Sequence, residues 1–208
     1  MTSIDHITLE VTDTAAAEKF YADAFDGVAP LRFRASDAAS TGFRGFTLSL
    51  IVSQPANAVS LIDTALAAGA TSLKPATKSL WGFGGVVQAP DGTIWQVSTS
   101  NKKDTAPVSR NVDEIVLLLG VEDVAATKQF YTERGIPVAK SFGKKYVEFD
   151  TSGSPVKLAL YKRKGLAKVA GVSPEGSGSH RIVVGGDLGA FTDPDGFTWE
   201  NANHATPA

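Results

Sequence analysis

The sequence predicts an α+β fold in which one unit of strands and a helix occurs twice. Each half of the chain opens with a short strand, an acidic turn and a helical stretch that ends on a Phe-Tyr pair, at Phe20-Tyr21 and again at Phe130-Tyr131. Each half also closes on a Pro-Asp-Gly turn, at 90–92 and at 194–196, followed by a strand that contains Trp-Gln or Trp-Glu. Similar segments at a nearly constant offset indicate an internal duplication.

The first half begins with a strand over 4–11, because apolar and polar residues alternate there and give the strand one face of each kind. A helix follows; residues 12–14 supply its N-cap and Gly27 ends it. The remaining predicted elements are strands over 31–35 and 43–52, a helix over 55–69, short strands over 71–75 and 85–88, and a strand over 93–99.

The second half repeats this order with differences. Its predicted elements are a strand over 112–119, a helix over 123–134, strands over 138–150 (kinked near Gly143) and 156–162, a Gly, Ser and Pro-rich loop over 165–179, a strand over 181–184 and a last strand after the 193–196 turn. The first half has no counterpart of the strands over 138–162, and the second half has no counterpart of the helix over 55–69. We therefore predict a first unit over 1–100, a linker over 101–110 and a second, differently trimmed unit over 111–204.

Composition limits the classes of function. The chain has 208 residues and a formal net charge of −2, so its overall charge does not attract nucleic acid or anionic membrane. It has no cysteine, which excludes disulfides, thiolate nucleophiles and cysteine-bound zinc. The N-terminus does not resemble a signal peptide, and no segment approaches the ~18 apolar residues that span a bilayer. We expect a cytoplasmic protein that binds a small molecule and binds neither nucleic acid nor a membrane.

Three segments carry a family resemblance. They are the opening Ile-Asp-His-Ile-Thr-Leu-Glu over 4–10, the closing Asp-Pro-Asp-Gly-x-x-Trp-Glu over 193–200, and the aromatic and glycine-rich segment over 79–85 that precedes the first hairpin. With them the chain resembles the glyoxalase / bleomycin-resistance / extradiol-dioxygenase superfamily, also called vicinal oxygen chelate proteins, over nearly its whole length. The resemblance implies duplicated βαβββ modules whose mixed, curved sheets enclose a cup and are flanked by helices. It also leaves a homodimer open.

In the enzymes of this superfamily, His, Glu or Gln residues from the first and last strands of the modules hold a divalent metal. The matching positions here are His6, Gln96, Glu114 and Glu200, and the resemblance implies them as ligands of one Zn, Ni, Fe or Mn ion. Glu200 or Glu114 would double as the catalytic base. A protein without metal is equally open. If each half forms its own cup, His6 and Gln96 share one while Glu114 and Glu200 share the other.

Aromatic and cationic side chains are the candidate lining of a ligand pocket. Aromatic residues more often fill a core than line a pocket, and arginines on neighbouring strands either meet an anionic ligand or face solvent. The candidates for the pocket are Trp81, Phe83, Arg44, Trp95 and Trp199, with Arg32 and Arg34 on strands near Arg44. We expect His180 to be exposed in its Gly-Ser loop and His204 to have no role near the chain end.

The sequence and the family resemblance predict two alternative functions. In the first, the protein binds or sequesters a small molecule between its sheets without a complete metal site, as the bleomycin-resistance branch does. The alternative is a metal-dependent lyase, isomerase or dioxygenase of the glyoxalase I or extradiol-dioxygenase type. The sequence does not decide whether the protein is an enzyme.

Overall fold

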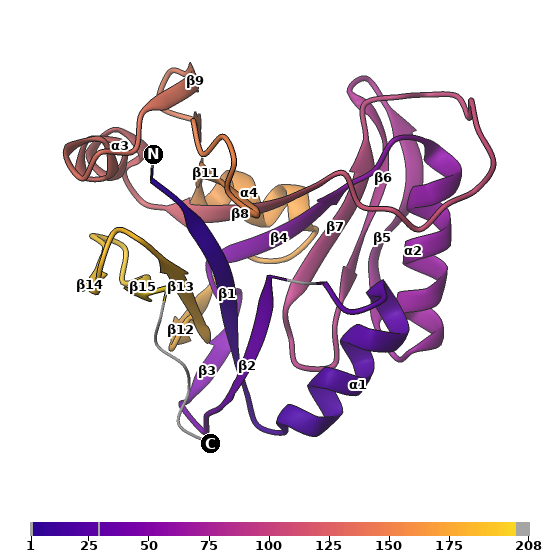
Figure 1. The fold of residues 1–208 in the computed structure, drawn as a ribbon, viewed down its shortest axis with the longest axis horizontal. Coiled ribbons are helices and arrows are strands. Elements are labelled where there is room, and N and C mark those ends of the chain that lie inside the picture. The colour runs from indigo at the N-terminus through magenta and orange to yellow at the C-terminus, as the bar shows by residue number, and fades with distance from the viewer. Residues whose placement is uncertain (1, 29, 203–208) are drawn as a thin grey trace.

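The computed structural model describes residues 2–28 and 30–202 and has the α+β fold that the sequence predicts. Most of its strands form two curved sheets, one of eight strands and one of five, and a short ribbon of two strands lies beside them (Figure 1).

The eight-stranded sheet consists of two βαβββ modules joined at their first strands. The first module is β4 (Phe46–Ile51), α2 (Pro55–Ala67), β5 (Thr71–Ser79), β6 (Gly82–Gln88) and β7 (Ile94–Thr99). The second is β8 (Glu114–Val121), α3 (Val124–Glu133), β9 (Val138–Phe142), β10 (Tyr146–Phe149) and β11 (Val156–Lys162). The strand order is β5-β6-β7-β4-β8-β11-β10-β9, with β4 and β8 antiparallel at the centre. In each module the last strand runs parallel to the first.

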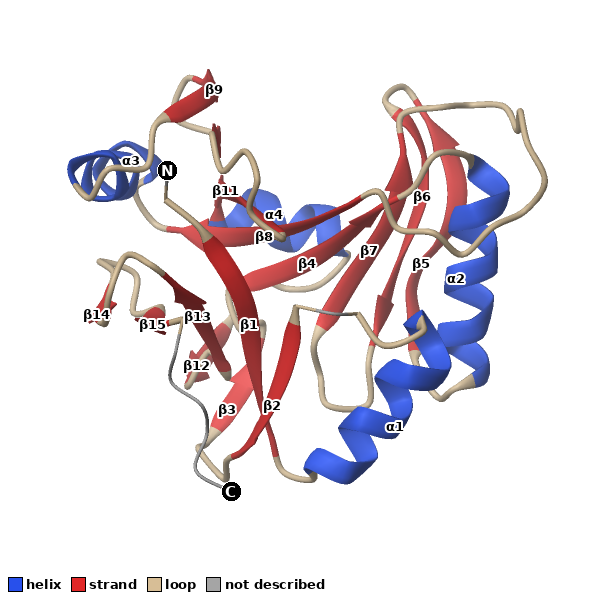
Figure 2. Cartoon of the chain, viewed as in Figure 1, coloured by secondary structure: helices blue, strands red, loops and turns tan. Residues whose placement is uncertain are grey.

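The five-stranded sheet brings the two ends of the chain together. Its order is β14-β15-β13-β1-β2, and β1 pairs antiparallel with β13. Its elements are β1 (Ile4–Val11), α1 (Thr14–Phe25), β2 (Leu31–Ala35), β13 (Ile182–Gly186), β14 (Phe191–Thr192) and β15 (Thr198–Asn201). Here α1 leads directly into the strand parallel to β1, and no helix connects β13 to β14. Helix α2 lies against β5 and β6, and α1 lies beside α2 and β2, as Figure 2 shows in blue. Both main sheets take strands from residues 1–100 and from residues 111–204.

One apolar core connects the two sheets. The inward faces of β1, β4, β8 and β11 pack with helices α1, α2 and α3. Trp95 and Trp199 are its largest buried side chains, and each donates its indole N–H to a buried tyrosine, Tyr21 and Tyr131 respectively. A large apolar side chain contributes about 1.5–3 kcal/mol by complete burial. The Phe-Tyr pairs and the closing tryptophans of the repeat therefore hold the helices against the sheets.

Two sequence predictions are wrong. The segment predicted as a loop over 165–179 contains helix α4 (Arg163–Ala170) and strand β12 (Gly176–Gly178), which pairs with β3 (Ser40–Gly42). Leu166, Ala167 and Ala170 pack against the outward face of the eight-stranded sheet, and this burial stabilises a short helix that Gly171 ends in a left-handed conformation. The predicted kinked strand 138–150 is the β9–β10 hairpin, since Gly143 adopts a φ of 58°.

Among the described residues, no helix combines the length and the apolar character needed to cross a membrane.

Candidate functional site

The four residues that the sequence nominates as metal ligands lie on different sheets. His6 is on β1 and Glu200 on β15, both in the five-stranded sheet. Gln96 is on β7 and Glu114 on β8, both in the eight-stranded sheet. The chain therefore has two separate candidate sites: the polar network around His6, and a groove on the outward face of the eight-stranded sheet.

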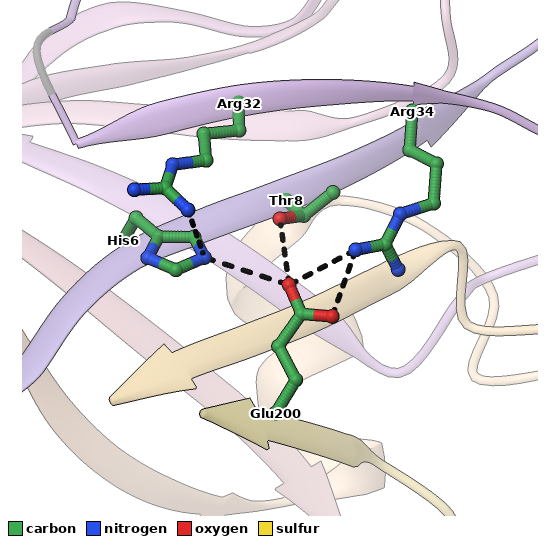
Figure 3. A network of polar contacts seen from close by, with 5 residues as sticks. All are labelled: His6, Thr8, Arg32, Arg34 and Glu200. Carbon is green, nitrogen blue, oxygen red and sulfur yellow. Dashed lines mark hydrogen bonds and ion pairs between the residues drawn. The ribbon is translucent and has the colours of Figure 1, made fainter. Parts of the chain in front are cut away.

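Strand register brings His6 and Glu200 together. His6 lies opposite Gly185 on β13, and Gly185 lies opposite Glu200 on β15, so the three positions form one row across the sheet. Because Gly185 has no side chain, the His6 ring occupies the space above it; a Cβ there would overlap the imidazole atoms. The His6 Nε2 atom lies 3.5 Å from Glu200 Oε1, and Thr8 donates to the same oxygen at 3.4 Å (Figure 3).

Two arginines from β2 cover this row. The Nη2 atom of Arg34 donates to both carboxylate oxygens of Glu200, at 3.0 Å to Oε1 and 2.7 Å to Oε2, and hydrogen bonds between charged groups of this kind are stronger than those between neutral groups. Arg32 Nη1 lies 3.2 Å from His6 Nε2 (Figure 3). A guanidinium only donates, so this bond makes Nε2 the acceptor and puts the ring proton on Nδ1. Five side chains from three strands thus form one connected network.

Burial and charge set the protonation of this network. Burial, and then the charge of Arg32, lower the pKa of His6 below its ordinary value, which favours the neutral ring. Burial alone would raise the pKa of Glu200, but the hydrogen bonds and charge of Arg34 outweigh it and lower that pKa. Around neutral pH the network therefore contains a neutral imidazole, one carboxylate and two guanidinium ions.

In this arrangement, His6 and Glu200 accept hydrogen bonds from arginine side chains and are poorly placed to bind a divalent metal. A metal needs several free lone pairs, usually from three or more protein side chains. Here Arg34 takes both oxygens of Glu200 and Arg32 takes the lone pair of His6. The described residues contain no cluster of three or more His, Cys, Asp or Glu side chains arranged to hold a metal ion.

The second candidate site is a groove of about 560 Å³ on the eight-stranded sheet. Helix α4 packs over part of the same face, and its Val169 borders the open part. Trp81 and Phe83 from the β5–β6 hairpin line the groove, and Tyr146 of β10 lines it as well. Glycines 82, 84 and 85 of β6 also border the groove. The site therefore combines aromatic surface with an open sheet face.

Polar groups line the same groove. Glu114 forms an ion pair with Lys157 of β11, and Glu148 lies 3.7 Å from Lys140. Gln96 of β7 lies on the lining as well. Burial, and then the charge of Glu148, raise the pKa of Tyr146 to about 12, so its hydroxyl stays protonated and can donate. The groove thus offers hydrogen-bond donors and acceptors beside aromatic rings.

The five nominated pocket residues divide between the groove and the interior. Trp81 and Phe83 line the groove. Trp95 and Trp199 are buried in the core, and Arg44 donates to the backbone carbonyl of Asp91 at the first Pro-Asp-Gly turn.

The three histidines have distinct surroundings. His6 is buried in the polar network. His180 is half-buried, where we expected exposure; its ring nitrogens contact the backbone oxygens of Arg44 and Asp195. His204 lies outside the described residues.

The sequence reading did not find several residues of both sites: Thr8, Gly185, Lys157, Tyr146 and Glu148. Thr8 was detectable, since it follows His6 by two positions and alternation places both on one face. Gly185 and Gly186 form a glycine pair within a strand, a signal of close approach by another group. The other three depend on which strands become neighbours, and periodicity does not reveal this.

Comparison with known proteins identifies the fold. No family model matches the chain, and no curated protein matches its sequence. Among solved structures, glyoxalase I from Zea mays is similar with a TM-score of 0.60 and 14% identity, covering 96% of this chain and 91% of that chain. A putative dioxygenase from Bacillus subtilis subsp. subtilis str. 168 has a TM-score of 0.54 and 14% identity, covering 93% of this chain and 71% of that chain. The chain therefore has the glyoxalase and dioxygenase fold, and the fold expected from the sequence resemblance is confirmed.

Proposed function

We propose that this protein binds a small organic molecule in the groove of the eight-stranded sheet and does so without a metal ion. The observation that carries the proposal is the groove itself, whose volume of about 560 Å³ falls within the range of small-molecule sites. It lies on a complete pair of βαβββ modules, whereas the five-stranded sheet is built from two shortened ones.

The lining indicates the chemistry of the ligand. Trp81 offers a ring on one wall, and Tyr146 offers a ring and a hydroxyl on the β10 side. Gln96, together with the Glu114–Lys157 pair, provides hydrogen-bonding groups that fix orientation. A ligand with a flat apolar part and one or two polar substituents matches this lining. The groove is open to solvent, so binding without chemistry, as in sequestration, suits it.

An environment-sensitive aromatic probe tests the proposal. We would titrate the protein with 1-anilinonaphthalene-8-sulfonate and follow the fluorescence of the probe. Trp81 is 84% exposed and lines the groove, whereas its neighbour Leu80 is 78% exposed and lies outside the lining. We expect 1:1 binding that Trp81→Ala weakens about fivefold, since one stacking contact contributes about 1 kcal/mol. Leu80→Ala is the matched control and should bind as the wild type does. An equal loss of probe affinity in both variants would mean non-specific adsorption and would refute binding in the groove.

The alternative function is a metal-dependent lyase, isomerase or dioxygenase. It is favoured by the 3.5 Å approach of His6 Nε2 to Glu200 Oε1, two donors of the kind that hold divalent metals. In that case His6 and Glu200 would ligate the ion, Arg34 would have to release the carboxylate, and Gln96 and Glu114 would act elsewhere. Metal analysis of wild-type protein and of His6→Ala separates the two functions. Near one Zn, Ni, Fe or Mn per chain, lost in the variant, would replace our proposal with this one.

A further inference from the structure

The network around His6 has an unbalanced positive charge at one end. Arg34 is neutralised by Glu200, with which it forms an ion pair at 2.7 Å. Arg32 has no carboxylate within 4 Å among the described residues, and the only side chain to which it hydrogen-bonds there is His6. Glu10 lies on the same face, but it is opposite Arg34, two register pairs beyond the Thr8–Arg32 pair. The excess charge therefore sits at Arg32.

Arg32 is exposed, yet its guanidinium is positioned by a buried group. His6 is 2% exposed and is held over Gly185, so the nitrogen that accepts from Arg32 Nη1 is fixed in place. A guanidinium carries five N–H donors, and this bond uses one of them. In Figure 3 the remaining nitrogens of Arg32 and the Nδ1 atom of His6 lie on the side away from Glu200.

The Nδ1 atom of His6 adds a further polar group on the side of the network away from Glu200 (Figure 3). It is a buried ring nitrogen without a hydrogen-bond partner among the described residues. Since Nε2 accepts from Arg32, Nδ1 carries the proton and is a donor. A buried donor without a partner is destabilising by about 1–3 kcal/mol, so an acceptor that approached it would add to binding. Donors of both residues thus meet at one edge of the network.

We infer that this face of the five-stranded sheet is a binding site for a small oxyanion, a carboxylate or a phosphate, held chiefly by the free edge of the Arg32 guanidinium. Planar guanidinium donors match the spacing of oxygens in both groups. His6 and Glu200 match positions that hold a metal ion in enzymes of the superfamily. Here Arg32 and Arg34 cover these positions, so the site would bind an anion instead of a metal cation. This site is distinct from the groove and does not depend on the function proposed for it.

Two anions and one pair of variants test this inference. We would record two-dimensional amide spectra of the 21.8 kDa protein during titration with inorganic phosphate and, separately, with acetate, at constant ionic strength set with chloride. We expect saturable shifts centred on β1 and β2. Arg32→Gln should weaken binding about tenfold, the effect of losing one charge-assisted contact. Arg134→Gln removes the same charge from an exposed arginine just after the end of α3 and should stay within about twofold of the wild type.

Each outcome of this experiment decides the inference. Saturation by either anion, lost in Arg32→Gln and kept in Arg134→Gln, supports it, and the anion that binds more tightly identifies the chemical source. Shifts that do not saturate, or equal affinity of Arg32→Gln and the wild type, overturn it. The probe-binding experiment on the groove is unaffected by either result, because Arg32 does not line the groove.

Discussion

The imidazole ring of His6 fills the space that the absent side chain of Gly185 leaves on β13. The two residues are opposite each other in the β1–β13 register, and a Cβ on Gly185 would have all its nearest neighbours within the His6 ring. This relationship explains why a strand of the five-stranded sheet carries a glycine at that point, although glycine weakens strands.

Gly185→Ala should reduce the free energy of unfolding by about 1–3 kcal/mol, because the ring must move out of a packed position. In a His6→Ala background the same substitution should cost much less, since the overlapping ring is gone. Urea unfolding of the wild type, both single variants and the double variant measures the coupling energy, expected at about 0.5–3 kcal/mol for residues in contact. Additive costs would show that the ring and Gly185 do not constrain each other.

The pH dependence of stability should report the buried state of His6. Its pKa is lowered in the folded protein, first by burial and then by Arg32. The unfolded chain therefore takes up a proton near the ordinary value of about 6.5 before the folded protein does. The stabilising contribution is complete above that value and is lost as the pH falls through the folded pKa. We expect the unfolding free energy of the wild type to decline as the pH falls below about 6.5.

His6→Gln is the control for this prediction, because it keeps a polar group beside Arg32 but does not titrate. Its decline over the same pH range should be smaller than that of the wild type. Arg32→Gln should raise the pKa of His6, since it removes the second cause of the shift. Imidazole NMR signals would measure this directly; an unchanged pKa would contradict the contact between Arg32 and His6.

Much of the secondary structure could be predicted from local pattern, and the reasons are visible in single residues. Alternation over 4–11 gives β1 its apolar and polar faces, and Asp13 and Asp123 cap α1 and α3 with their side chains as N-cap residues do. Helix α4 was missed because glycine and serine dominate the segment that follows it. Its stability depends on burial of Leu166 against the sheet, which no local pattern encodes.

The candidate sites could be predicted only in part. The sequence identifies His6 and Glu200 as polar residues at repeated positions, but their contact depends on β1 pairing with β13, which begins 171 positions beyond the end of β1. Periodicity shows which face of a strand is polar and does not name the neighbouring strand. For the same reason the sequence could not show that Arg34 would take both oxygens of Glu200.

Trp81 should dominate the solvent-accessible tryptophan fluorescence of this protein. The chain has three tryptophans; Trp81 is 84% exposed, while Trp95 and Trp199 are 0% and 1% exposed. Iodide should therefore quench one fraction of the emission and leave the other nearly unaffected. In Trp81→Phe the quenchable fraction should disappear. A strongly quenchable signal in that variant would mean that the buried tryptophans, and with them the core of the fold, are open to solvent.

The two halves of the chain build the same hydrogen-bonded connection from aspartates that do not correspond. Tyr21 donates to Asp91, the central residue of the first Pro-Asp-Gly turn, at 2.9 Å. Tyr131 donates at 2.7 Å to Asp193, which precedes the second turn. The first turn has Ala89 at the position of Asp193, so only its central aspartate can reach the tyrosine.

Tyr131→Phe should therefore be one of the more destabilising conservative substitutions in the chain. It leaves the indole N–H of Trp199 without an acceptor and removes a donor from the Asp193 carboxylate in a buried setting. An expected loss of about 1–3 kcal/mol in the free energy of unfolding follows from such unpaired groups, measured by urea unfolding. Tyr146→Phe is the matched control, because its hydroxyl makes a longer contact of 3.4 Å at a half-buried position. Comparable losses in the two variants would mean that the connection through Tyr131 contributes little, and that apolar packing alone holds α3 against β15.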